Sequence, residues 1–146
     1  RAILAGEPIE VYNNGQHARD FTYIDDIVGG IRKAMEYVVK GYEVFNLGND
    51  QPTKLIDLVH TIEDVLGKAA EIEWLPMQTG DVPKTWADLE KSESILGYRP
   101  NTSLVDGLTR FKKWLEESIT ERGHSHENQK GDHPSGWVGD TVLTSD

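Results

Sequence analysis

Two short segments of this sequence carry side chains that could bind a charged ligand. The first contains Arg19, which follows a turn at Gly15, and a guanidinium group presents a planar fork of donors that matches phosphate oxygens. In the second, Gln78 and Asp81 flank Gly80, a residue that permits a sharp turn. Amides and carboxylates hydrogen-bond to hydroxyl groups, so the diol of a ribose is a suitable partner for Asp81. These residue types suit a diphosphate at Arg19 and a ribose diol at Asp81.

A second interpretation of the same residues needs no ligand. Arg19 is followed by Asp20, and the two can form a surface ion pair. Gly80 and Asp81 can form an ordinary turn. The spacing of these residues by itself favours this structural interpretation over a binding site.

The composition excludes several functional classes. The chain has 146 residues, 37% of them hydrophobic, and a formal net charge of −10, which fits one globular domain and argues against nonspecific nucleic-acid binding. It contains no cysteine, so a reducing cytoplasm is the expected compartment. No apolar run is long enough to cross a bilayer, and we expect no membrane partner. The chain starts at Arg1 rather than at methionine, which indicates a piece of a longer protein.

The order of apolar patterns predicts an α/β fold. Short apolar runs predict strands over residues 9–13, 21–23, 44–47 and 72–75. Apolar residues at helical spacing predict helices over residues 25–40, 53–66, 88–96 and 103–119. Asp25 and Asp88 are expected to cap their helices, and Ser103 with Asp106 resembles a capping box. Glycine is expected to end the second helix at Gly67.

The composition changes after Ile119. Residues 120–146 are rich in polar residues and glycine without a sustained apolar period, so we expect a domain over residues 1–119 and a disordered tail over 120–146. Three histidines, His124, His126 and His133, lie in this tail. We expect no metal site there, because a flexible segment does not hold ligands in a fixed geometry.

Several separated segments resemble, in the same order, the C-terminal part of the NAD-dependent nucleotide-sugar epimerases and dehydratases, which belong to the extended short-chain dehydrogenase/reductase superfamily. The matching segments are Pro8-Ile-Glu-Val-Tyr12, Gly15 with Arg19-Asp-Phe-Thr-Tyr-Ile-Asp-Asp26, Val44-Phe-Asn46-Leu-Gly48, Gln78-Thr-Gly80-Asp81-Val-Pro83, Ala87-Asp88 and Leu96-Gly97-Tyr-Arg-Pro100. The run Leu-Pro-Met-Gln-Thr-Gly-Asp-Val-Pro is most similar to the pattern of the UDP-glucuronate 4-epimerases. The resemblance extends from Arg1 to about Ile119.

The resemblance implies a substrate-binding role for the matching residues. Arg19 would contact the diphosphate of a UDP-sugar, Asp81 would contact its ribose, and Tyr12 would lie against the uracil. Gln78 stands where many relatives have a second phosphate-binding arginine, so it would attract phosphate less strongly or anchor the ligand differently. Thr85 stands where some galactose epimerases have a tyrosine, and that sugar contact is in doubt.

The sequence lacks the groups that perform the chemistry of this family. It has no Gly-x-x-Gly-x-x-Gly loop for NAD and no Tyr-x-x-x-Lys pair, since Tyr37 and Lys40 are three positions apart rather than four. We therefore expect no catalytic residue on this chain. The resemblance implies a C-terminal substrate-binding portion, in which the strand at 44–47 and the helix after Asp25 would complete a missing Rossmann domain. That N-terminal half would bind NAD and would be a partner of this chain. The substrate would be a UDP-sugar. A homodimer of the complete enzyme is left open.

Two alternatives remain open on the sequence. A nucleotide-sugar dehydratase or decarboxylase would share nearly all of these residues, because most of the distinguishing catalytic groups lie in the missing half. A noncatalytic module that binds a nucleotide sugar or a protein partner is an answer of a different class, and it is favoured if the natural gene begins near Arg1.

Overall fold

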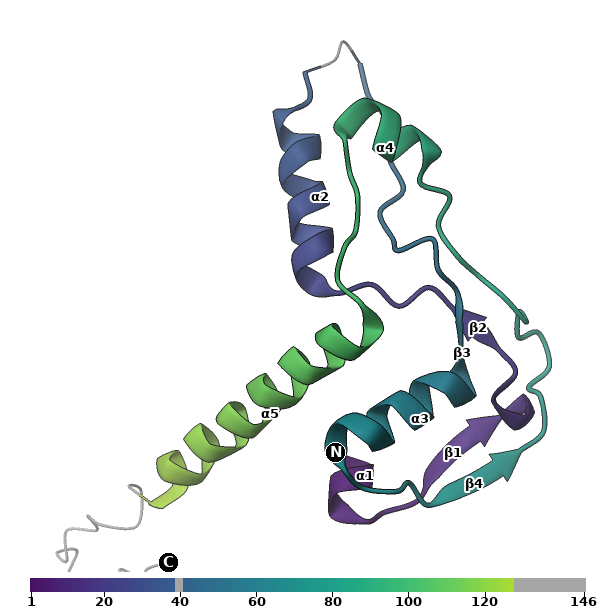
Figure 1. The fold of residues 1–146 in the computed structure, drawn as a ribbon, viewed down its shortest axis with the longest axis vertical. Helices are drawn as coiled ribbons and strands as arrows, with labels where there is room; N and C mark the ends of the chain where they lie inside the picture. The colour runs from purple at the N-terminus through teal and green to yellow at the C-terminus, as the bar shows by residue number, and fades with distance from the viewer. Residues whose placement is uncertain (39–40, 128–146) are drawn as a thin grey trace, which may run out of the picture. The chain divides into compact units, whose positions relative to one another are not determined.

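The computed structural model describes residues 1–38 and 41–127 (Figure 1). The contacts divide the chain into two units, Arg1–Lys112 and Lys113–Asp146. The elements of the first unit are α1 (Ala2–Ala5), β1 (Ile9–Tyr12), the 3-10 turn η1 (Asn13–Gly15), β2 (Ala18–Arg19), α2 (Ile24–Glu36), β3 (Thr53–Lys54), α3 (Leu55–Leu66), β4 (Ile72–Leu75) and α4 (Glu90–Leu96). The last helix, α5 (Leu104–Glu127), starts in the first unit and ends in the second.

The strands form two small sheets. β1 lies parallel to β4, with Ile9 opposite Ile72 and Tyr12 opposite Leu75 (Figure 1). β2 pairs antiparallel with β3, and Ala18 forms a parallel bridge with Lys84 on its other side. The backbone of β2 is therefore hydrogen-bonded on both edges, and this fixes the position from which Arg19 projects. The expected α/β class is confirmed.

Several predicted elements match the structure because their signals are local. β4 covers the predicted range 72–75, and α3 ends at Gly67, whose φ of 67° is left-handed. α4 ends at Gly97, where φ is 62°. The predicted cap of this helix is wrong: α4 begins at Glu90 with Leu89 as its N-cap, so Asp88 lies one residue too early, although its carboxylate accepts a hydrogen bond of 3.0 Å from the Glu90 amide.

Two predicted strands are wrong. Residues 21–23 form no strand, because Tyr23 is already the N-cap of α2 and the strand lies earlier, at β2. Residues 44–47 are not assigned as a strand either, and among the described residues no strand is paired with them. Instead, Asn46 donates through its side-chain amide to the Asp88 carbonyl and accepts at its own carbonyl from the Ser92 hydroxyl.

The predicted cap of α2 is also wrong. The helix begins at Ile24 with Tyr23 in extended conformation as its N-cap, so Asp25 lies inside the first turn. Its carboxylate oxygen Oδ2 lies 3.7 Å from a terminal guanidinium nitrogen of Arg110 instead. The helix ends at Glu36, earlier than predicted, and residues 39–40 lie outside the described residues.

The core beside α2 depends on a glycine. Leu89, Leu96 and Tyr98 form a buried cluster, and Tyr98 donates a 2.8 Å hydrogen bond to the Gly48 carbonyl. A Cβ at Gly30 would lie 2.7 Å from the side chain of Leu47 and 2.8 Å from the ring of Tyr98. The absence of a side chain at Gly30 therefore lets α2 approach this cluster.

The start of α5 shows half of the predicted capping box, the bond from the Asp106 amide to Ser103. The Asp106 amide donates to the Ser103 hydroxyl at 3.1 Å, and that hydroxyl donates to the Asp106 carboxylate at 2.7 Å. The helix extends to Glu127 rather than ending at Ile119. The division into a domain over residues 1–119 and a tail over 120–146 stays a prediction. Residues 128–146, which include His133, lie outside the described part of the chain.

None of the helices described is both long and apolar enough to cross a membrane. Within the same residues, no group of three or more histidine, aspartate or glutamate side chains is arranged to hold a metal ion.

Candidate functional site

Arg19 and Asp81 form an ion pair across 62 sequence positions. One terminal nitrogen of Arg19 lies 3.1 Å from Oδ1 of Asp81, and the other donates at 2.9 Å to the Ala18 carbonyl. The two side chains are 34% and 31% exposed. The guanidinium is thus held in one place while part of its surface remains open to a ligand.

His17 is a third member of this cluster, and the sequence reasoning missed it. Its Nδ1 lies 3.3 Å from Oδ2 of Asp81, and the residue is 4% exposed. The spacing of the two residues could have predicted it. Residues two apart in an extended segment point to the same side, and His17 is two residues before Arg19.

Gln78 and Asp81 belong to one turn, as predicted. The Asp81 amide donates to the Gln78 carbonyl at 3.2 Å, and Gly80 between them has a φ of 86°. This positive φ explains why glycine occupies the position. The turn places the Gln78 amide and the Asp81 carboxylate on a single short segment after β4.

Tyr12 lies beside Gln78. The Tyr12 hydroxyl donates at 2.9 Å to the Glu10 carboxylate, and this hydrogen bond, with smaller effects of burial and of the negative charges on Glu10 and Glu73, raises the pKa of Tyr12 above its usual value of 10.0. The neighbouring Gln78 side chain acts in the opposite direction and lowers the pKa. The pairing of Tyr12 with Leu75 at the end of β4 explains this proximity.

The structure therefore brings the four predicted site residues together in two linked pairs. Tyr12 neighbours Gln78, Arg19 pairs with Asp81, and one turn joins the two pairs. They come from β1, β2 and the segment after β4. The arrangement offers a cation, a carboxylate, an amide and an aromatic ring, which are the groups that bind phosphate, hydroxyls and a planar base.

Asp20 does not form the surface ion pair that was the alternative role for Arg19. Its carboxylate accepts hydrogen bonds of 3.0 to 3.4 Å from the backbone amides of Asn49, Asp50 and Gln51, and one of 3.1 Å from Ala87. Asp20 thereby connects two loops, and Arg19 forms its ion pair with Asp81 instead.

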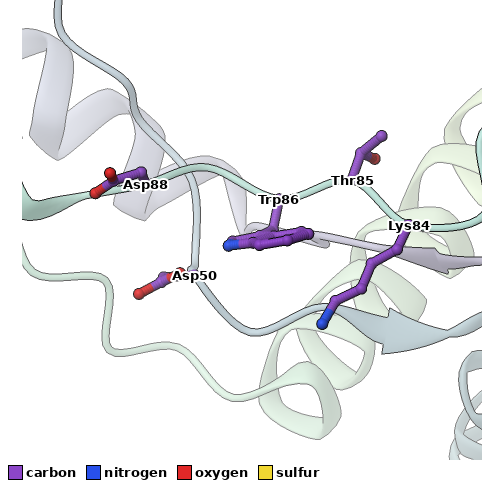
Figure 2. A pocket seen from close by; sticks show the side chains of 5 residues that line it. All are labelled: Asp50, Lys84, Thr85, Trp86 and Asp88. Atoms are coloured by element: carbon purple, nitrogen blue, oxygen red, sulfur yellow. The ribbon is translucent and has the colours of Figure 1, made fainter.

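Two cavities adjoin the segment 84–88. A cavity of about 540 Å³ is lined by residues that include Arg19, Phe45, Thr85 and Trp86. A second, of about 590 Å³, is lined by Asp50, Lys84, Thr85, Trp86 and Asp88. Figure 2 shows these five side chains with the indole ring of Trp86 in their midst. Thr85 and Trp86 line both cavities, and Arg19 lines the first. Thr85, whose sugar contact the sequence left in doubt, therefore lies near Arg19.

The Lys84 ammonium lies 4.5 Å from the centre of the Trp86 ring. A cation at this distance interacts favourably with the face of an indole. The second cavity therefore combines a positive charge and an aromatic surface with the carboxylates of Asp50 and Asp88.

The described residues contain no dinucleotide-binding loop of the Rossmann type. Such a site needs a strand that leads through a glycine-rich loop to a helix N-terminus. Of the two parallel strands described, β1 leads into η1, and β4 leads into the irregular segment before α4. Neither connection supplies the required loop.

Comparison with known proteins places the chain in a family. The family described as GDP-mannose 4,6 dehydratase matches residues 1–111. An uncharacterised protein of Methanocaldococcus jannaschii is 51% identical over 116 residues, which are 80% of this chain and 35% of the relative. The UDP-glucuronate 4-epimerase of Thermodesulfobacterium geofontis is 38% identical over 118 residues, which are 80% of this chain and 36% of that enzyme.

A solved structure supports the same relationship. The UDP-glucuronic acid 4-epimerase of Bacillus cereus, in complex with UDP-glucuronic acid and NAD, matches with a TM-score of 0.68 and 35% identity, over 73% of this chain and 34% of that protein. The chain spans about a third of the length of these relatives. It belongs to the NAD-dependent nucleotide-sugar epimerase and dehydratase family of the extended short-chain dehydrogenases/reductases.

Proposed function

We propose that this chain is the C-terminal, substrate-binding portion of an NAD-dependent sugar 4-epimerase that acts on UDP-glucuronate. The observation that carries the proposal is the convergence of Tyr12, Arg19, Gln78 and Asp81 in one solvent-accessible cluster. The similarity to UDP-glucuronate 4-epimerases supports the choice of substrate.

Arg19 binds the diphosphate in this proposal. A charge-assisted hydrogen bond contributes roughly 1.5 to 3 kcal/mol, which corresponds to about a tenfold to hundredfold change in affinity. The ion pair with Asp81 leaves Arg19 oriented, and each oxygen of a carboxylate has more than one lone pair. Asp81 can therefore keep its contact with Arg19 and still accept a hydrogen bond from a ribose hydroxyl.

Tyr12 and Gln78 bind the base end of the ligand. The Tyr12 ring offers an apolar face to uracil, and the Gln78 amide offers both a donor and an acceptor. Gln78 carries no charge, so in this chain Arg19 is the cation of the cluster that attracts the phosphates.

The rest of the longer protein binds NAD and supplies the catalytic groups. This chain binds and orients the nucleotide sugar and contributes no proton donor or acceptor to the reaction. The exposed apolar side chains of Ile24, Val28, Ile31 and Met35 recur on α2 at helical spacing, and we infer that the dinucleotide-binding half covers them.

Calorimetric titration of the purified chain with UDP, UDP-glucuronate and GDP tests the proposal. We expect both uridine nucleotides to bind more tightly than GDP. Arg19→Ala should weaken uridine-nucleotide binding by about tenfold or more. Asp81→Ala should also weaken it, because the ribose contact is lost and Arg19 loses its orienting partner.

Arg99→Ala is the matched control, because Arg99 forms an ion pair with Glu93 that is largely exposed and contacts none of the four residues. It should bind UDP as the parent chain does. A folded chain that binds none of the nucleotides, or one that binds them equally well after Arg19→Ala, would contradict the proposal.

A further inference from the structure

We propose that His17 is a positioning residue that orients the Asp81 carboxylate and, through it, the Arg19 guanidinium. The inference rests on the proposed function, since it concerns how the nucleotide-binding groups are held. His17 itself need not touch the ligand, because its side chain is 5% exposed whereas that of Asp81 is 31% exposed.

The backbone around His17 is held on both sides. Its carbonyl accepts a 2.8 Å hydrogen bond from the Leu55 amide. The next residue, Ala18, donates to the Pro83 carbonyl at 2.9 Å and accepts from the Thr85 amide at 3.2 Å. The imidazole therefore projects from a fixed point, and the segment that carries Asp81 is tied to the same strand.

The two oxygens of Asp81 have different partners. Oδ1 faces Arg19 at 3.1 Å, and Oδ2 faces Nδ1 of His17 at 3.3 Å. Because each oxygen has its own partner, rotation of the carboxylate would lengthen at least one of these two contacts. Removal of His17 would leave Asp81 with one anchor and a wider choice of rotamers, at an entropic cost when a ligand binds.

The environment of the imidazole indicates which nitrogen carries the proton. A carboxylate only accepts hydrogen bonds, so Nδ1 must be the donor in this contact. Nε2 is buried and has no hydrogen-bond partner among the described residues. The contact with Asp81 therefore places a proton on Nδ1.

A double-mutant cycle separates positioning from general packing. UDP affinity is measured by calorimetry for the parent chain, His17→Phe, Asp81→Ala and the double variant. We expect His17→Phe, which keeps a ring but removes the donor, to weaken UDP binding by about threefold to tenfold. In the Asp81→Ala background the same change should have no further effect, because the group that His17 orients is gone.

The conservative variant His17→Asn provides a rescue, since its amide can donate from a position close to that of Nδ1. It should restore UDP affinity to within about twofold of the parent chain. An equal loss of affinity from His17→Phe with and without Asp81 would overturn the proposal, because His17 would then act independently of Asp81.

A second measurement needs neither a ligand nor a change at His17. Nitrogen NMR of the histidine rings should show a proton on Nδ1 of His17 and a change in its signals in Asp81→Asn. Unchanged signals would overturn the inference even if UDP binds. If the signals change but the parent chain binds no UDP, the contact exists while the proposed function fails, and the role in nucleotide binding fails with it.

Discussion

At the scale of single residues, Asp20 has the densest set of polar contacts in the described structure near the site. Its carboxylate accepts from the backbone amides of Asn49, Asp50, Gln51 and Ala87. A Cβ at Gly48 would lie 2.6 Å from Oδ2 of Asp20, so the neighbouring loop closes tightly around the carboxylate. Asp20 thus fixes the loops that line the two cavities beside Trp86.

We expect Asp20→Ala to lower the free energy of unfolding by about 2 to 4 kcal/mol, because the partly buried amides of Asn49 and Ala87 lose their acceptor. Asp20→Asn should cost less, since its amide oxygen can still accept. Urea denaturation followed by circular dichroism measures both. Asp64→Ala is the control, at an exposed carboxylate, and equal losses in Asp20→Ala and Asp64→Ala would contradict the assignment.

The buried Tyr98 hydroxyl makes the free energy of unfolding fall at alkaline pH. Tyr98 is 2% exposed, and burial, followed by the negative charges of Asp26 and Asp20, raises its pKa above 10.0. The unfolded chain therefore releases this proton first, so the stabilisation is complete below about pH 10 and falls as the pH rises through the folded-state pKa.

Denaturation at about pH 9 and about pH 11 should show that Tyr98→Phe reduces this loss of stability. The variant is also expected to be less stable at both pH values, by about 1 kcal/mol, because it lacks the hydrogen bond to the Gly48 carbonyl. Tyr42→Phe, at a residue that is 89% exposed, should leave the pH dependence unchanged. An identical slope in parent and Tyr98→Phe chains would refute the interpretation.

At the scale of elements, α2 contains two adjacent glycines with opposite surroundings. A Cβ at Gly30 would lie within 2.8 Å of Leu47 and Tyr98, whereas a Cβ at Gly29 would meet nothing within 4 Å. Glycine lowers helix propensity at both positions, but only Gly30 is required by packing.

The substitution Gly30→Ala should therefore destabilise the chain by about 1 to 3 kcal/mol through overpacking. Gly29→Ala should stabilise it by up to about 1 kcal/mol through helix propensity. Thermal unfolding of both variants measures the contrast. Stabilisation by both changes would show that α2 does not pack against Tyr98 as described.

At the scale of the whole molecule, the first unit leaves apolar surface exposed. Met35 is 80% exposed and Val44 is 68% exposed, on α2 and on the extended segment that follows it. Contiguous exposed apolar surface in a soluble domain is commonly an interface, and the chain spans about a third of the length of its relatives.

We expect the isolated chain to self-associate as its concentration rises, in sedimentation velocity measurements. Replacing both Ile31 and Met35 by lysine should reduce this association without loss of helix content, because both side chains are exposed. Val105→Lys, a change at an exposed apolar residue on α5, should leave it unchanged. A chain that stays monomeric at high concentration would contradict the prediction.

The amino-acid sequence by itself determined the α/β class, β4, the C-terminal ends of α3 and α4 and the Ser103 cap of α5. These features depend on periodicity, caps and residue type, which act over a few positions. Only the tertiary structure decided that Asp81 pairs with both Arg19 and His17, that Asp20 accepts from two loops, and that residues 44–47 form no strand. A strand needs a neighbouring strand to pair with, and an ion pair across 62 positions depends on the path of the whole intervening chain.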